Sequence, residues 1–279
     1  MLRTMSEPRE LMLTDAQSGA IAVIAPERGG IVTRFDIGAR RVLFLDVATL
    51  RDPTKNVRGG VPVLFPSPGK LTDDAWSYAG RHGAMKQHGF ARNLPWQIAS
   101  SSAGAAVLTL AANDATLAQF PWDFVVEQTF TVRGTSLRLD QRVTNRSASA
   151  MPFGLGFHPY FFVADAAKRD TTIATRATRA FDNVTKQVIA LPAIDLTQPE
   201  VDLHLIDHGS TASELVTPSG TVQLRGSPEY THWVVWTLAG RDFVCLEPWT
   251  CPGNALNTGD GLLVLAPGES RALSIEIIA

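Results

Sequence analysis

Two adjacent runs in which apolar and polar residues alternate constrain the fold of this chain more than any other feature. In residues 124–132 (FVVEQTFTV) and 137–143 (LRLDQRV), every second side chain is apolar, apart from one glutamine in each run. A period of two is typical of a strand with one buried face. The segment Arg133-Gly134-Thr135 between them reads as a turn, so the two runs predict an antiparallel hairpin.

Most of the remaining chain also reads as short strands separated by turns, and helical signals are weak. Residues 115–120 could form one or two helical turns, and no other segment keeps a helical period for about 10 residues. The segments 46–57 and 178–204 are expected to be irregular loops, which often build ligand sites in all-β proteins. The pattern predicts an all-β sandwich, organised as a single domain over residues 1–279. Further strands are predicted at residues 20–24, 31–37, 42–44, 106–111, 232–238, 243–246, 262–265 and 273–277.

Charge and composition exclude several classes of partner. The chain has 25 basic and 27 acidic residues, which leaves no positive excess for nucleic acid or an anionic membrane surface. No run approaches the roughly 18 apolar residues of a membrane-spanning helix, and the start, Met1 to Glu7, does not resemble an export signal. Cys245 and Cys251 are too few for a disulfide framework and lack the paired spacing of a zinc site. We therefore expect a soluble, cytoplasmic protein with reduced thiols and a neutral or small anionic ligand.

Four stretches place ionisable groups beside glycine, proline and aromatic residues, a composition that suits the walls of a pocket. They are residues 58–70 (RGGVPVLFPSPGK), 87–96 (QHGFARNLPW), 154–161 (GLGFHPYF) and 243–249 (FVCLEPW). The chain lacks a phosphate-binding glycine loop followed by Lys-Ser/Thr, a Gly-x-Ser-x-Gly elbow and a helical histidine pair for a metal. The composition favours acid–base chemistry on a polyol, without a metal or cofactor.

Each of these groups also has an ordinary structural interpretation. A histidine in an aromatic strand, such as His158, is more often a neutral, hydrogen-bonded core residue than a catalyst. Glu247 is harder to explain in that way, because a glutamate is rarely buried unless it is paired and burial raises its pKa toward the range of a general base. His88 could hydrogen-bond a turn, Arg58 could be a solvated loop charge and Lys70 an exposed loop end.

Three motifs in this order together resemble the aldose 1-epimerase (galactose mutarotase-like) family. They are QHGFAR at residues 87–92, FHPYF at 157–161 and CLEP at 245–248. The resemblance runs from about Gly29 to Glu276, which is nearly the whole chain. It implies a β-supersandwich of two large, twisted antiparallel sheets. It also implies interconversion of the α and β anomers of a free sugar, with no metal or cofactor.

The resemblance also implies roles for individual residues. Glu247 matches the general base that takes the proton of the anomeric hydroxyl, and His158 matches the acid that protonates the ring oxygen. His88 matches a second histidine near the ring oxygen, and Asp207 resembles the aspartate that binds sugar hydroxyls. These roles agree with the chemistry, because ring opening removes one proton at the C1 hydroxyl and delivers another to the ring oxygen.

The first motif region departs from the pattern of many mutarotases. Residues 67–70 read SPGK where those proteins have Asn-Arg, so Lys70 replaces a planar, forked donor by a point charge. Arg58 and Arg92 lie in motifs that look like the hexose-6-phosphate branch, where such arginines help to hold the phosphate. The partner is therefore a sugar or a sugar phosphate. A sugar-binding module without turnover and an unrelated β-sandwich are the alternatives, and a monomer or weak dimer is expected.

Overall fold

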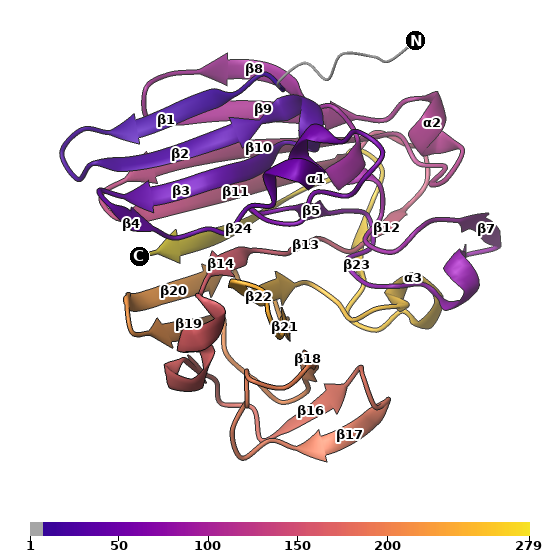
Figure 1. The fold of residues 1–279 in the computed structure, drawn as a ribbon. Coiled ribbons are helices and arrows are strands. Elements are labelled where there is room, and N and C mark those ends of the chain that lie inside the picture. Colours follow the sequence, from indigo (N-terminus) through magenta and orange to yellow (C-terminus); the bar gives the residue numbers. More distant parts are fainter. Residues whose placement is uncertain (1–7) are drawn as a thin grey trace, which may run out of the picture.

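The computed structural model describes residues 8–279, and the segment Met1 to Glu7, from which no export signal was expected, lies outside the described residues. Two large antiparallel sheets dominate the fold (Figure 1). Sheet I has the strand order β15 (Thr172–Ala174), β19 (Ala212–Thr217), β20 (Gly220–Gly226), β24 (Ser270–Ile278), β11 (Ser136–Asn145), β10 (Phe124–Arg133), β9 (Ala105–Ala111) and β8 (Gln97–Ser101). Sheet II has the order β17 (Gln187–Ala190), β16 (Arg179–Asp182), β18 (Glu200–Leu205), β21 (His232–Leu238), β22 (Phe243–Trp249), β13 (Gly156–Phe157) and β5 (Val63–Leu64), and β14 (Tyr160–Phe162) also pairs with β22.

The predicted hairpin is present as β10 and β11 at the centre of sheet I. Its pairing runs from Phe124 opposite Asn145 to Arg133 opposite Ser136, with a two-residue turn between the strands. Gly134 in that turn has a φ of +57°, a conformation that glycine adopts without steric cost. The side chains of both strands alternate between buried and half-buried positions. The two-residue period therefore predicted both the strands and the face that packs on the core.

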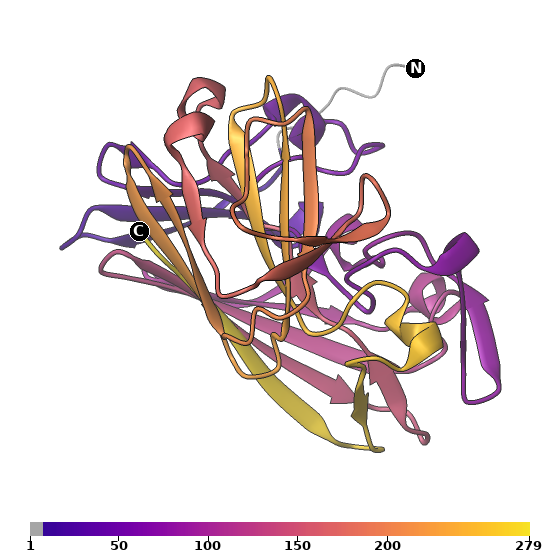
Figure 2. The same cartoon turned by 90° about the horizontal axis from the view of Figure 1, so that it is seen from below.

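Smaller elements complete the fold, and the first two strands of the chain contact β10 in the interior of sheet I. Viewed from below, strands of the two large sheets cross at an angle rather than running side by side (Figure 2). Figure 1 places β7 and α3 together at one side of the molecule. The additional elements are a four-stranded sheet of β1 (Leu11–Asp15), β2 (Ala20–Ala25), β3 (Ile31–Ile37) and β4 (Arg40–Arg41), the pairs β6 (Ala75–Tyr78) with β7 (Arg81–Ala84) and β12 (Met151–Phe153) with β23 (Leu263–Leu265), and the short helices α1 (Val47–Arg51), α2 (Asp114–Leu117) and α3 (Ala255–Thr258).

Two sequence expectations about local structure were wrong. The segment 178–204 is not an irregular loop, because it contains β16, β17 and most of β18. Residues 200–205 (EVDLHL) alternate polar and apolar side chains, which is the pattern of a strand with one buried face. Residues 42–44 form no strand of their own, although an isolated bridge joins Leu43 to Phe161. The expected loop 46–57 contains α1, whose first turn is capped by the Asp46 carboxylate.

The main hydrophobic cluster includes residues from Leu13 to Ile277, so widely separated segments share it. The arrangement of residues 1–279 as a single domain stays a prediction. Both cysteines are free and buried. Among residues 8–279, no helix has the length and hydrophobicity needed to cross a lipid bilayer.

Candidate active site

Three neighbouring strands of sheet II form one wall of a large cavity. Their side chains point alternately to the two faces of the sheet, as in the β10–β11 hairpin. On β18, β21 and β22, one set of side chains packs in the hydrophobic core and the other set faces the cavity. The pairing register places His204 opposite Val234, and Val234 opposite Glu247. The cavity has a volume of about 890 Å³, which is within the usual range for small-molecule sites. The cavity-facing residues of these strands are Glu200, Asp202, His204, His232, Val234, Trp236, Glu247 and Trp249.

Glu247 is a buried carboxyl group on the cavity side of β22, with only 1% of its surface exposed. The indole Nε1 of Trp249 donates a hydrogen bond to its Oε2 at 3.2 Å. Burial raises the pKa of Glu247 well above its ordinary value, the nearby Asp202 raises it further, and the bond from Trp249 and the charge of Arg92 partly oppose the shift. A buried carboxyl group with a raised pKa keeps its proton to higher pH than an ordinary glutamate, so it is suited to exchange that proton with a ligand.

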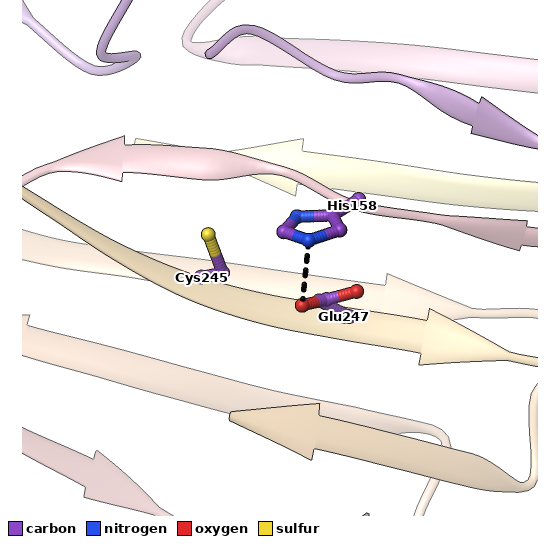
Figure 3. A group of neighbouring side chains, drawn as sticks. All are labelled: His158, Cys245 and Glu247. Carbon is purple, nitrogen blue, oxygen red and sulfur yellow. Dashed lines mark ion pairs between the residues drawn. The ribbon is translucent and has the colours of Figure 1, made fainter. Parts of the chain in front are cut away.

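His158 follows β13 and faces Glu247 from the neighbouring segment. Its Nε2 lies 3.3 Å from Glu247 Oε1 (Figure 3). Its ring stacks on Tyr160 with a centroid separation of 4.6 Å and an interplanar angle of 11°. Burial lowers the pKa of His158 well below its ordinary value, and His88 and Arg92 lower it further. Its buried Nδ1 has no hydrogen-bond partner among residues 8–279.

The His158–Glu247 pair is placed to share one proton. Burial disfavours the charge on both partners, so a single proton is held over the pH range between their two pKa values. Transfer over 3.3 Å converts a carboxylic acid and a neutral imidazole into a carboxylate and an imidazolium. The pair can therefore remove a proton at one side of a ligand and supply one at the other.

Removal of the indole donor should change the pH dependence of this pair. Because the Trp249 bond lowers the pKa of Glu247, Trp249→Phe is expected to raise that pKa. The active pair carries one proton and loses it above this pKa, so the basic limb of a rate profile should move to higher pH. On the plateau below that limb, kcat/KM should fall about 10-fold, because the carboxylate–imidazolium form becomes rarer when a hydrogen bond to the charged group, worth about 1.5–3 kcal/mol, is lost.

A pH profile of anomer exchange checks this expectation. Trp122→Phe is the matched control, because Trp122 donates to the Ala150 carbonyl oxygen, outside the cavity. An unchanged plateau rate and an unchanged basic limb in Trp249→Phe would contradict the assigned contact.

His88 lies on a tight turn that brings it to the cavity. His88 and Gly89 both have positive φ values, 71° and 69°, and a Cβ on Gly89 would lie 2.1 Å from the Phe65 carbonyl oxygen, so only glycine fits there. His88 Nδ1 bonds to the carbonyl oxygen of Pro68, so Nδ1 carries the proton and Nε2 is an acceptor, which lies 3.3 Å from Gln87 Nε2. Burial lowers the pKa of His88 to about 3, which keeps the imidazole neutral.

The three cations singled out in the sequence line the same cavity as His158 and Glu247. Arg92 is half-buried, its Nη2 donates to the Gln87 carbonyl oxygen at 3.2 Å, and its buried Nε has no partner among residues 8–279. The guanidinium of Arg58 lies 5.9 Å from the centre of the Trp236 ring. Lys70 is exposed at the cavity edge.

The segment that carries Lys70 has a structural reason for its departure from the Asn-Arg pattern. A Cβ on Gly69 would lie 2.3 Å from the Cα of Gly253, so the two backbones approach closely at this point. Next to it, the amide of Asn254 donates to the Lys70 carbonyl oxygen at 2.8 Å. The backbone at 69–70 is thus fixed, and the Lys70 side chain reaches the cavity from its edge.

The structure does not bring Asp207 to this cavity. Its carboxylate accepts hydrogen bonds from the amides of Thr178 and Arg179 and from the Thr178 hydroxyl. These bonds lower the pKa of Asp207 to about 2. The carboxylate is used to connect two chain segments, which makes it a poor ligand for a sugar. Asp202, five positions earlier on β18, lines the cavity instead.

The sequence analysis missed an imidazole pair that packs on the indole of Trp249. His204 Nδ1 lies 2.8 Å from His232 Nε2. His232 stacks on Trp249 at 5.7 Å and 28°, and His204 meets the same indole edge-on at 5.5 Å. Burial lowers the pKa of His232 to about 3. The signal was available: polar residues at every second position of 200–204, beside core residues Val201 and Leu203, indicate a strand with a functional outer face.

The fold and this site define a class: a two-sheet antiparallel β-sandwich with a buried imidazole–carboxylate pair in a ligand-sized cavity. Residues 12–277 match the family model described as aldose 1-epimerase. The chain belongs to the aldose 1-epimerase family, as the three motifs suggested.

Individual relatives agree with this assignment. A protein of Cenchrus ciliaris, provisionally named glucose-6-phosphate 1-epimerase, is 26% identical over 259 residues, covering 79% of this chain and 72% of the relative. The solved structure of the Slr1438 protein from Synechocystis sp. PCC 6803 is 37% identical with a TM-score of 0.95, covering 100% of this chain and 98% of that chain. The solved structure of a galactose mutarotase-like protein from Lactobacillus casei shares the fold, with 22% identity and a TM-score of 0.77. The match covers 97% of this chain and 99% of that chain. The predicted fold, a sandwich of two large antiparallel sheets, is confirmed.

Proposed function

We propose that this protein is a mutarotase that interconverts the α and β anomers of a hexose, with a hexose 6-phosphate as the preferred substrate. The observation that carries the proposal is the buried His158–Glu247 pair at 3.3 Å in a cavity lined by three cationic side chains. Membership of the aldose 1-epimerase family supports the reaction type. The provisional name of the Cenchrus relative supports a phosphorylated substrate.

The proposed reaction is a proton exchange in two steps. In the carboxylate–imidazolium form of the pair, Glu247 takes the proton of the C1 hydroxyl and His158 gives its proton to the ring oxygen, so that the bond between C1 and the ring oxygen breaks. Rotation about C1–C2 presents the other face of the aldehyde. The two residues then exchange roles, the ring closes and the pair regains its starting protonation. Hydrogen bonds from sugar hydroxyls to Glu247 favour the ionised carboxylate that starts the reaction.

The remaining groups are assigned to binding. His88, with Nε2 as an acceptor, is placed to receive a hydrogen bond from a sugar hydroxyl. Asp202 takes the hydroxyl-binding role first expected of Asp207. Its Oδ2 already accepts from Asn183 Nδ2 at 2.6 Å, which fixes its orientation toward the ligand.

The placement of charge favours a phosphate at one end of the ligand. Glu200 and Asp202 lie on β18, while Arg58 and Arg92 come from segments that flank β5. In the strand order of sheet II, β22 with Glu247 lies between β18 and β5. A hexose 6-phosphate would therefore direct hydroxyls toward the carboxylates and the phosphate toward the guanidinium of Arg92. The Arg58 guanidinium lies over Trp236 on β21, nearer to the carboxylates of β18. The unpartnered Arg92 Nε supplies a donor for a phosphate oxygen.

Polarimetry and NMR exchange spectroscopy test this function on freshly dissolved α-glucose, α-galactose and glucose 6-phosphate. We expect acceleration of anomer exchange over buffer, with the highest kcat/KM for glucose 6-phosphate. Acceleration that is larger for a neutral hexose would retain the mutarotase and reject the phosphate preference. Sugar binding seen by calorimetry without acceleration for any of the three would reject catalysis and favour a binding module.

Substitution of Arg92 should separate phosphate recognition from chemistry. Arg92→Gln is expected to lower kcat/KM for glucose 6-phosphate by about 10²-fold, because charge-assisted hydrogen bonds contribute about 1.5–3 kcal/mol. Because Arg92 also lowers the pKa of Glu247, the rates should be compared on the pH-independent plateau, between the two limbs of the rate profile. There, the rate with glucose should change less than about threefold.

The matched control is Arg225→Gln, a change on β20 of sheet I, away from the cavity. An equal loss for glucose and glucose 6-phosphate in Arg92→Gln would show that this residue acts on the chemistry, and would overturn its assignment to the phosphate.

A further inference from the structure

A third potential metal ligand lies beside the acid–base pair, and the proposed reaction does not use it. His158, Cys245 and Glu247 each offer one ligand atom, and these atoms lie within 4.8 Å of one another. Cys245 precedes Glu247 by two positions on β22, so the two side chains project from the same face of the strand (Figure 3). Imidazole, thiolate and carboxylate form a ligand set typical of zinc.

From this arrangement we propose that His158, Cys245 and Glu247 form an inhibitory site for a thiophilic divalent cation such as Zn²⁺ or Cd²⁺. Binding of the cation would occupy both groups that exchange protons in the proposed reaction. The proposal that the cation binds depends only on the three-residue cluster. The proposal that it inhibits anomer exchange rests on the proposed function.

The distances between the ligand atoms suit one tetrahedral ion. With Zn–N and Zn–O bonds of about 2.0–2.1 Å, two ligand atoms lie about 3.3–3.4 Å apart. His158 Nε2 and Glu247 Oε1 are 3.3 Å apart. The thiolate needs a separation of about 3.6 Å from each of the others, given a Zn–S bond of about 2.3 Å. Since the three ligand atoms already lie within 4.8 Å of one another, a shift of about 1 Å is sufficient.

The net charge of the filled site suits its burial. A divalent cation with one thiolate, one carboxylate and one neutral imidazole has no net charge, so the complex avoids the large cost of an isolated buried ion. A coordinating thiol loses its proton to the metal ion's field, even where burial otherwise keeps it protonated. The cavity face of the pair provides a route for the ion, because His158 and Glu247 both line the cavity. The fourth position then faces the cavity and can hold water or a sugar hydroxyl.

The direct test uses metal-free protein titrated with Cd²⁺, whose bond to a thiolate gives a charge-transfer absorption in the ultraviolet. We expect this band to saturate at one Cd²⁺ per chain. Cys245→Ser should remove the band and weaken Cd²⁺ binding by more than about 10²-fold, since the loss of an outer-shell partner alone costs about 10–100-fold. The matched control, Cys251→Ser, should keep the band, because Cys251 is also buried but does not belong to the cluster. Mg²⁺, a hard cation, should not displace Cd²⁺.

Absence of the band in the wild-type protein, or its persistence in Cys245→Ser, would overturn the site. If Cys245→Ser fails to fold, Glu247→Gln provides a second test, because it keeps both thiols. It should weaken Cd²⁺ binding at least about 10-fold, and unchanged affinity would also overturn the site. Zn²⁺ should inhibit anomer exchange in a way that a chelator reverses, and full activity with the site saturated would reject the inhibitory role. A Cd²⁺ band in a protein that accelerates no sugar would uphold the metal site and reject the mutarotase.

Discussion

Replacement of Glu247 by glutamine is expected to lower kcat for anomer exchange by about 10²–10⁴-fold while the protein stays folded. The amide keeps the shape of the side chain, and its oxygen can still accept the hydrogen bond from Trp249 Nε1. It cannot take up a proton from the C1 hydroxyl, which is the step that the proposal assigns to Glu247. Polarimetry with glucose 6-phosphate and circular dichroism of the same preparation measure both expectations.

The stability of this variant provides a second readout with a defined sign. Burial raises the pKa of Glu247 in the folded protein, so the folded state holds this proton more tightly than the unfolded chain. The stability that this provides is present below the unfolded pKa and is lost as the pH rises through the folded pKa. Glutamine has no such loss, so the Tm of Glu247→Gln at neutral pH should equal or exceed that of the wild-type protein.

The matched control is Glu214→Gln on β19, whose carboxylate accepts from Gln223 Nε2 at 2.6 Å and lies outside the cavity. It should leave anomer exchange unchanged. Wild-type rates in Glu247→Gln would remove the base from the proposed mechanism.

The parts of the fold that the sequence predicted are those determined by local patterns. The β10–β11 hairpin was predictable because two alternating runs are separated by a turn containing Gly134. The pairing of β22 with β13 and β14 was not, because positions 158 and 247 are 89 residues apart and no local rule selects a partner at that separation. Only the ordered resemblance to a family indicated that His158 and Glu247 would meet.

Asp207 was expected in the site from the family resemblance alone, whereas the omission of the β18 residues follows from interpreting 178–204 as a loop. Once β18 is recognised as a strand, its period of two places Asp202 and His204 on the cavity face. Asp207 lies beyond the end of that strand, where its carboxylate accepts bonds from Thr178 and Arg179. A charged face on a short strand weakens the hydrophobic signal that identifies strands, and in this protein that face builds the site.

A substitution of His158 should have an effect as large as that of Glu247→Gln, because both groups act on one proton. His158→Asn is expected to lower kcat by about 10²–10⁴-fold, since the amide cannot protonate the ring oxygen. If the two residues act as a unit, the double variant with Glu247→Gln should be little slower than the slower single variant, because groups that act together are strongly non-additive. If the rate losses of the two single variants multiply in the double variant, the two residues have independent roles.

The control is His82→Asn, an exposed change on β7, which should leave the rate unchanged. His158 Nε2 and Glu247 Oε1 are in contact at 3.3 Å. We therefore expect a coupling energy between the two substitutions that nearly equals the effect of either substitution alone.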